Sequence, residues 1–170
     1  ANDIWAVGVG GALFHYTGSW AATASGVTQD LQGVWGSAAN DVWAVGGNGT
    51  AIHFNGTAWS TTNTGTTQTL VSVWGSSSSD VWAVGLAGTI IHWSGSSWAA
   101  VNSNTTNPLY SVWGTSGTDI WAVGAAGTIR HYNGTTWAAS NSGTTSDLYS
   151  VSGSSTSDVW AAGINGVARH

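Results

Sequence analysis

Lysine, glutamate, methionine and cysteine are absent from this chain of 170 residues, which has two Arg, seven Asp and a formal net charge of −5. Two cations cannot neutralise a phosphate backbone, so the composition excludes a nucleic-acid partner and a polybasic membrane anchor. Without Cys there is no disulfide and no thiolate metal site. The longest nearly apolar stretch, Val81 to Ile91, is about half as long as a membrane-spanning helix. We therefore expect no membrane insertion.

What the chain has in abundance, 13 Trp and 25 Gly, falls on an internal repeat. The string Asp-(Ile/Val)-Trp-Ala-(Val/Ala)-Gly begins at Asp3, Asp41, Asp80, Asp119 and Asp158, with spacings of 38, 39, 39 and 39 residues. All five His follow their Asp at a distance of 12 residues: His15, His53, His92, His131 and His170. Periods of about 40 residues are typical of solenoids and propellers.

Each repeat has the period-2 pattern of β-strands. The third copy shows four short runs rich in β-branched and aromatic residues, at 70–74, 81–84, 89–93 and 98–101, separated by Gly, Ser and Asn turns. No stretch has helical periodicity. Four short antiparallel strands per repeat predict an all-β fold, a β-propeller of four-stranded blades.

The repeat resembles a known family, most clearly over Asp119–Trp137, where Asp-x-Trp-Ala-Val-Gly leads to His-Tyr-Asn-Gly-Thr-Thr-Trp. It looks like the bacterial propeller repeats of the BNR and photosystem II assembly-factor-like group, over essentially the whole chain. The turn at residues 133–137 is shorter than the Asp-box of such repeats and lacks its Asp. A weaker likeness links the chain to Trp-rich propeller lectins. Such a motif specifies fold strongly and function poorly.

The resemblance implies that the Leu-x-(Ser/Gly)-Val strand is innermost in each blade. The predicted blades are then residues 1–30 (without an inner strand), 31–69, 70–108, 109–147 and 148–170 (without an outer strand). This phasing predicts eighteen strands, two fewer than a closed ring of five four-stranded blades needs. Exposed strand edges favour self-association that completes the propeller, or a part of a larger one.

The repeated Asp and His have two interpretations. They could be dyads for general base chemistry, or structural pairs in which the Asp caps a turn and binds the His of the third strand. Five equal copies favour the structural interpretation, and the pairs of the three complete blades are Asp41–His53, Asp80–His92 and Asp119–His131. The His lie on third strands, too far from the axis to converge on one metal ion, so we expect no metal.

The sequence lacks the catalytic residues that an enzyme of this fold would need. A sialidase needs an Arg cluster, but Arg130 and Arg169 occupy one equivalent position in two blades. A glycosidase needs two carboxylates in different environments, and beyond the repeated Asp only Asp30 and Asp147 remain, again equivalent. The sequence therefore predicts a non-catalytic protein without a cofactor.

Aromatic rings and neutral polar loops suit carbohydrate binding, in which sugar faces stack on aromatic side chains. We expect one candidate Trp set to end the inner strands near the central opening, and a second to follow the outer turns, where its members clamp the turn or flank a groove. The candidate ligand-binding residues are Trp35, Trp74 and Trp113 (inner), Trp59, Trp98 and Trp137 (outer), and Asn104, Asn107, Asp30 and Asp147 in the polar connections.

The sequence thus predicts a non-catalytic module with lectin-like recognition of neutral glycans at repeated sites between blades. The alternative is a structural or protein-interaction propeller scaffold without a small ligand, whose partner is a protein surface. The absence of Lys and Met leaves little for trypsin or oxidants to attack, which favours a secreted or cell-surface location.

Overall fold

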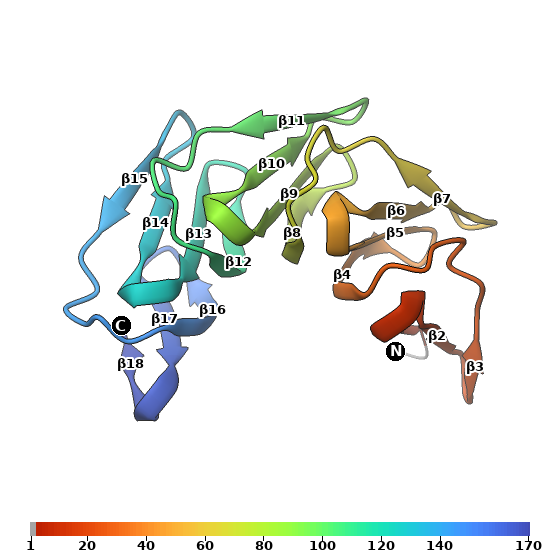
Figure 1. Ribbon diagram of the computed structural model, residues 1–170, viewed down its shortest axis with the longest axis horizontal. Helices are drawn as coiled ribbons and strands as arrows, with labels where there is room; N and C mark the ends of the chain where they lie inside the picture. The colour runs from red at the N-terminus through yellow and green to blue at the C-terminus, as the bar shows by residue number, and fades with distance from the viewer. Residues whose placement is uncertain (1–2) are drawn as a thin grey trace.

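Each repeat folds into its own antiparallel sheet, and consecutive strands along the chain are neighbours in the sheet. The computed structural model describes residues 3–170. Its sheets form an arch, with inner strands on the concave side and outer strands along the convex edge (Figure 1). This arrangement confirms the predicted all-β propeller of four-stranded blades with three-stranded terminal blades.

The strands have the following bounds. Blade 1 contains β1 (Ile4–Val7), β2 (Leu13–Tyr16) and β3 (Trp20–Ala22). Blade 2 contains β4 (Leu31–Ala38), β5 (Asp41–Gly46), β6 (Ala51–Phe54) and β7 (Trp59–Thr62). Blade 3 contains β8 (Leu70–Ser77), β9 (Asp80–Gly85), β10 (Ile90–Trp93) and β11 (Trp98–Val101). Blade 4 contains β12 (Leu109–Ser116), β13 (Asp119–Gly124), β14 (Ile129–Tyr132) and β15 (Trp137–Ser140). Blade 5 contains β16 (Leu148–Ser155), β17 (Asp158–Gly163) and β18 (Ala168–Arg169).

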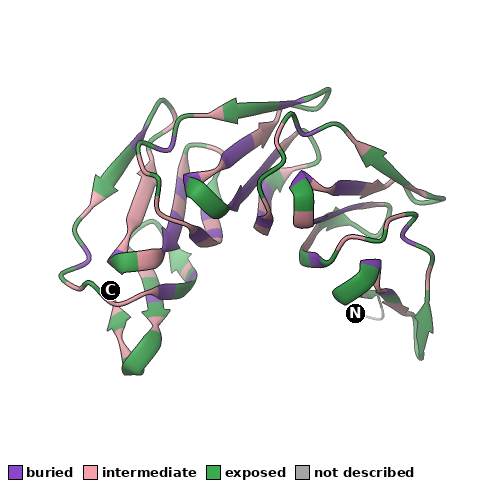
Figure 2. Ribbon diagram, in the orientation of Figure 1, coloured by how far each residue is buried: buried purple, intermediate pink, exposed green. Residues whose placement is uncertain are grey.

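The second strand of a central blade is buried on both faces, because blades stack face to face. In β9 every residue from Val81 to Gly85 is buried. Apolar side chains on alternate faces of this strand therefore contact different neighbouring blades. Figure 2 shows burial concentrated in these second and third strands, whereas the outer strands are mostly exposed.

The inner strands carry a glycine that the preceding blade requires. A Cβ atom at Gly75 would lie 2.6 Å from the Trp35 ring, and one at Gly114 would lie 2.8 Å from the Trp74 ring. Only glycine leaves room for an indole so close to the strand. The inner strands of adjacent blades are also joined by hydrogen bonds, such as Val112 N–H to Ser72 Oγ at 3.3 Å.

Candidate functional site

The repeated Asp and His form a compact polar network, seen most fully around Asp80. Its Oδ1 lies 2.6 Å from His92 Nε2 and accepts the Trp82 indole N–H at 2.9 Å. Its Oδ2 accepts the hydroxyl of Ser76. The His92 ring also stacks on Trp82, with ring centroids 4.1 Å apart. The network thus connects the inner strand, the second strand and the third strand of one blade.

The same Asp–His pair recurs in all five blades. The distance from Nε2 to Oδ1 is 2.5 to 2.6 Å in the first four copies and 3.2 Å for His170 and Asp158. The structure therefore brings together Asp41 with His53, Asp80 with His92, and Asp119 with His131.

Sequence reasoning missed the hydroxyl of this network. A Ser or Thr four residues before the Asp binds its second carboxylate oxygen in blades 2 to 5: Ser37, Ser76, Thr115 and Ser154. The sequence does contain a signal for this hydroxyl: a Ser or Thr directly follows the glycine of the inner strand in each of these four blades.

In two copies of the network, hydrogen bonds lower the pKa of the carboxyl group. Partial burial alone would raise the pKa of Asp119, but hydrogen bonds with Thr115 and His131 outweigh it and hold that pKa below its usual value. Hydrogen bonds from Ser154 and Trp160 likewise lower the pKa of Asp158. A carboxylate with a lowered pKa and occupied oxygens is a weak general base, so the network is suited to holding strands together.

The outer Trp set lies between blades. Trp137 is 1% exposed and packs on Trp82 of the preceding blade, with centroids 5.7 Å apart. Trp98 packs edge-on against Trp43 at 5.1 Å and donates its indole N–H to Thr62 Oγ1. Trp59, half-buried, packs in the same way on Trp5 of blade 1. Their ring faces are therefore engaged in blade packing.

The inner Trp set is half-buried and also lies between blades. The rings of Trp35, Trp74 and Trp113 cover Gly75, Gly114 and Gly153 of the following blade. They lie within the inner strands rather than at their ends, because these strands continue three residues past each Trp.

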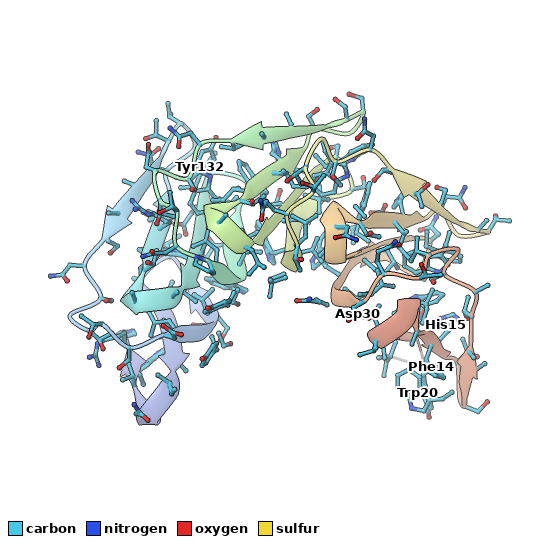
Figure 3. All side chains as sticks on the ribbon, in the orientation of Figure 1. Phe14, His15, Trp20, Asp30 and Tyr132 are labelled. Carbon is cyan, nitrogen blue, oxygen red and sulfur yellow. The ribbon has the colours of Figure 1, made fainter. Side chains whose placement is uncertain are left out.

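The candidate polar residues also join blades. Asp30 Oδ1 accepts the Gly10 N–H at 2.7 Å, and Asp147 Oδ1 accepts the Ala126 N–H at 2.8 Å. Figure 3 places Asp30 on the concave side of the arch. Asn104 donates to the Trp137 carbonyl at 2.9 Å, and Asn107 donates to Thr128 Oγ1 at 2.8 Å.

A second feature that sequence reasoning missed is a tyrosine pair near the start of two inner strands. Tyr110 and Tyr149 are each the extra residue of a β-bulge, and their rings are tilted by 34° with centroids 5.3 Å apart. Tyr149 is 51% exposed. The equivalent residues of blades 2 and 3 are Gln32 and Val71. We call these four residues the inner rim.

Electrostatics at the inner rim are acidic. Burial, then the Asp147 carboxylate and Tyr149, raise the pKa of Tyr110 above its usual value. Both guanidiniums of the chain bind loop carbonyls of the preceding blade. Arg130 donates to the Asn104 carbonyl and Arg169 to the Ser142 carbonyl, each at 2.6 Å.

Residues 3–170 contain no group of three or more His, Cys, Asp or Glu placed to hold a metal ion. They also contain no helix with the length and apolar character needed to cross a bilayer.

Comparison with known proteins shows similarity in fold. No family model and no curated protein matches it. Among solved structures, YCF48 bound to a D1 peptide matches with a TM-score of 0.72 at 17% identity, over 98% of this chain and 59% of that chain. YCF48 from Cyanidioschyzon merolae matches with a TM-score of 0.73 at 16% identity, over 99% of this chain and 65% of that chain. The chain thus spans less than two thirds of the length of either structure.

These comparisons correct the predicted location and weaken the case for a carbohydrate ligand. The prediction of a secreted or cell-surface location is wrong, because the neighbours are YCF48 proteins, which are not secreted or cell-surface proteins. Lys and Met are missing because one repeat unit lacks them in all five copies, and this says nothing about compartment. Carbohydrate binding gains no support, since the ligand in the matching structure is a peptide. At the level of fold, the chain is similar to YCF48 and to the photosystem II assembly-factor-like propellers that its repeat resembles.

Proposed function

We propose that this chain is a non-catalytic, protein-binding propeller that holds an extended peptide segment of its partner at the inner rim. The observation that carries the proposal is the half-exposed tyrosine pair, Tyr110 and Tyr149, in a molecule whose other aromatic positions are largely used for blade packing. The peptide-bound YCF48 neighbour supports a peptide as the ligand.

Tyrosine is well suited to this role. Its ring provides a large apolar surface at low conformational cost, while its hydroxyl satisfies polar groups of a partner's backbone. The inner strand β12 contacts the turn Leu86–Gly88 of the preceding blade, and Leu86 is 38% exposed. An exposed aliphatic side chain on a turn that contacts β12 adds apolar surface for a partner side chain.

Charge limits the kind of peptide. Asp147 lies close enough to raise the pKa of Tyr110, and the two Arg of the chain are committed to loop carbonyls. The Asp147 carboxylate beside Tyr110 would repel an acidic segment, so the inner rim fits an uncharged or cationic one.

Catalysis is not part of the proposal. In each of the five blades the His Nε2 lies 2.5 to 3.2 Å from the Oδ1 of its Asp, and no pair is singled out by an environment of its own, as the carboxylate or imidazole of an active site would be. A set of hydrogen-bonded pairs repeated in every blade supports a structural role for these Asp and His residues.

A peptide library and a glycan array, both probed with the same labelled protein, test the proposal. We expect peptides without acidic residues to bind, and Tyr149→Ala to weaken the best of them at least tenfold. Trp20→Ala is the matched control, because Trp20 is equally exposed, at 53%, but lies on outer strand β3 of blade 1 (Figure 3). Binding to neutral glycans alone, or equal peptide affinity for Tyr149→Ala and the native protein, would overturn it.

A further inference from the structure

A carboxylate lies beside the tyrosine pair of the inner rim. Asp147 directly precedes β16 and lies two residues before Tyr149, whose ring packs on that of Tyr110 with centroids 5.3 Å apart. Burial, and after it the Asp147 carboxylate, raises the pKa of Tyr110, so the negative charge acts on the hydroxyl of this ring. Two aromatic rings and one anionic group therefore come together at this part of the rim.

Asp147 is held in place by the blades on both sides of it. Its Oδ1 accepts the Ala126 N–H of blade 4 at 2.8 Å, and its main-chain carbonyl accepts the Ile164 N–H of blade 5 at 3.0 Å. Tyr110 also lies between blades, because β12 contacts both β8 and β16. A carboxylate and a ring that are already positioned lose little conformational entropy when a ligand binds to them.

The second oxygen of this carboxylate is available to a ligand. Within residues 3–170, Asp147 Oδ2 accepts no hydrogen bond and forms no salt bridge. The chain has no Lys, and both of its Arg donate to loop carbonyls instead. Asp147 is half-buried, so water screens its charge less than it would screen a fully exposed carboxylate.

Blade 2 contains the same carboxylate without the tyrosines. Asp30 accepts the Gly10 N–H at 2.7 Å through Oδ1, and its carbonyl accepts the Gly47 N–H at 2.8 Å, just as Asp147 does at its own position. The residue two positions later is Gln32. The contact between blades therefore needs only the Asp, and the tyrosine pair beside Asp147 is an additional feature of blades 4 and 5.

An anionic oxygen beside an aromatic ring is complementary to a guanidinium group. The flat face of a guanidinium stacks on a tyrosine ring by cation–π attraction, while its N–H groups donate to a carboxylate. A lysine ammonium pairs with the carboxylate as a point charge but has no flat face to stack.

We propose that the inner rim selects an arginine side chain of the bound segment, with its guanidinium stacked on Tyr110 and donating to Asp147 Oδ2. This inference rests on the proposed function, because the arginine belongs to the segment that the inner rim holds. It names the one partner side chain that the rim distinguishes from the others.

Peptides that differ only in charge test this selection. A library peptide that binds is resynthesised with Arg at each position in turn, and with citrulline, the neutral isostere of Arg, at the same position. Fluorescence anisotropy should show one position at which the Arg peptide binds at least about fivefold more tightly than its citrulline counterpart. Lys at that position should bind less tightly than Arg, and added salt should weaken the Arg peptide more than the citrulline peptide.

Variants of the protein locate the preference. Asp147→Asn keeps an acceptor for the Ala126 N–H and should bring the affinities of the Arg and citrulline peptides close together. Asp30→Asn is the matched control, because it removes the same charge from the equivalent position beside Gln32, and it should leave the preference unchanged. Tyr110→Phe keeps a ring for stacking and should retain the preference, whereas Tyr110→Leu should reduce it.

The possible failures can be told apart. Equal affinities of the Arg and citrulline peptides at every position would overturn the arginine assignment while peptide binding at the inner rim remained. A preference for Arg that survives both Asp147→Asn and Tyr110→Leu, or a Lys peptide that binds as tightly as the Arg peptide, would also contradict it. Absence of any binding peptide would overturn the proposed function and this inference together.

Discussion

Trp137 packs in one core cluster with Val101, which has no atom able to accept the hydrogen bond of the buried Trp137 indole N–H. One blade earlier, the equivalent pair is satisfied, because Trp98 donates to Thr62 Oγ1 at 3.1 Å. The same repeat position thus holds an acceptor in blade 2 and none in blade 3.

Val101→Thr should therefore stabilise the protein. Thr has nearly the shape of Val and supplies the missing acceptor, which removes a penalty of about 1 kcal/mol for an unsatisfied buried donor. The free energy of unfolding in urea measures the change. Thr62→Val is the reciprocal variant and should lose about the same amount; a stability for Val101→Thr below that of the native protein would contradict the argument.

A left-handed backbone conformation at Ala87 leads to a second prediction. The turn between second and third strands needs φ of +53° to +58° at one position, which Asn48 and Asn165 occupy in blades 2 and 5, and Ala87 and Ala126 in blades 3 and 4. Asn tolerates this region better than Ala because its side chain can hydrogen-bond locally. We expect Ala87→Asn to raise the free energy of unfolding by about 0.5–1 kcal/mol.

Ala99→Asn is the control for this variant, because Ala99 is also exposed but lies in the extended strand β11. Asn is disfavoured in strands, so this substitution should give no gain. An equal effect of the two substitutions, read from thermal or urea unfolding, would mean that the backbone conformation at Ala87 is not the cause.

The connection before each inner strand carries a third prediction. Asp30 and Asp147 each accept a backbone N–H from the hairpin turn of the preceding blade. Thr69 holds the equivalent position before β8 and makes no such side-chain bond among the described residues. Thr69→Asp should add a charge-assisted hydrogen bond to the turn of blade 2, worth about 1 kcal/mol in unfolding free energy.

Asp147→Asn tests the same bond from the other direction. Asn keeps the shape and an acceptor but loses the charge, so we expect a smaller loss than for Asp147→Ala. The comparison uses urea unfolding at neutral pH and low salt. If Thr69→Asp destabilises the chain while Asp147→Ala has no effect, these carboxylates do not stabilise the contact between blades.

The fold follows from the sequence because its repeat anchors the register five times. Asp, Trp and Gly recur at fixed spacing. Each of them marks a turn, a packed face or a close approach to the backbone, and the residue type alone is enough to predict it. The ends of the inner strands were harder to predict. The bulge at Tyr110 breaks the alternation, and β8 continues to Ser77, beyond the run at 70–74.

The environment of the candidate residues could not be predicted in the same way. Alternation shows which face of a strand a Trp lies on, but the partner of Trp35 is Gly75, a residue 40 positions away in another blade. Neither residue alone indicates this contact. Composition was a poorer guide still, since the absence of Lys and Met reflects one repeated unit and led to a wrong location.

The Asp–His network leads to the last prediction, which concerns pH. The pKa of Asp119 is lowered in the folded protein, so its ionised form contributes stability above the unfolded pKa of about 4. That contribution is lost as the pH falls through the lower, folded pKa. At pH 7, Asp119→Asn should cost about 1–3 kcal/mol, since hydrogen bonds with Thr115 and His131 lose their charged acceptor. As the pH falls through this lowered, folded pKa, the native Asp119 takes up a proton and resembles Asn, so the difference between native protein and variant should shrink. Urea unfolding of both proteins from pH 7 to pH 2.5 measures this difference. A difference that stays constant over the whole range would show that the charge of Asp119 does not stabilise the blade, and that only the shape of its side chain matters.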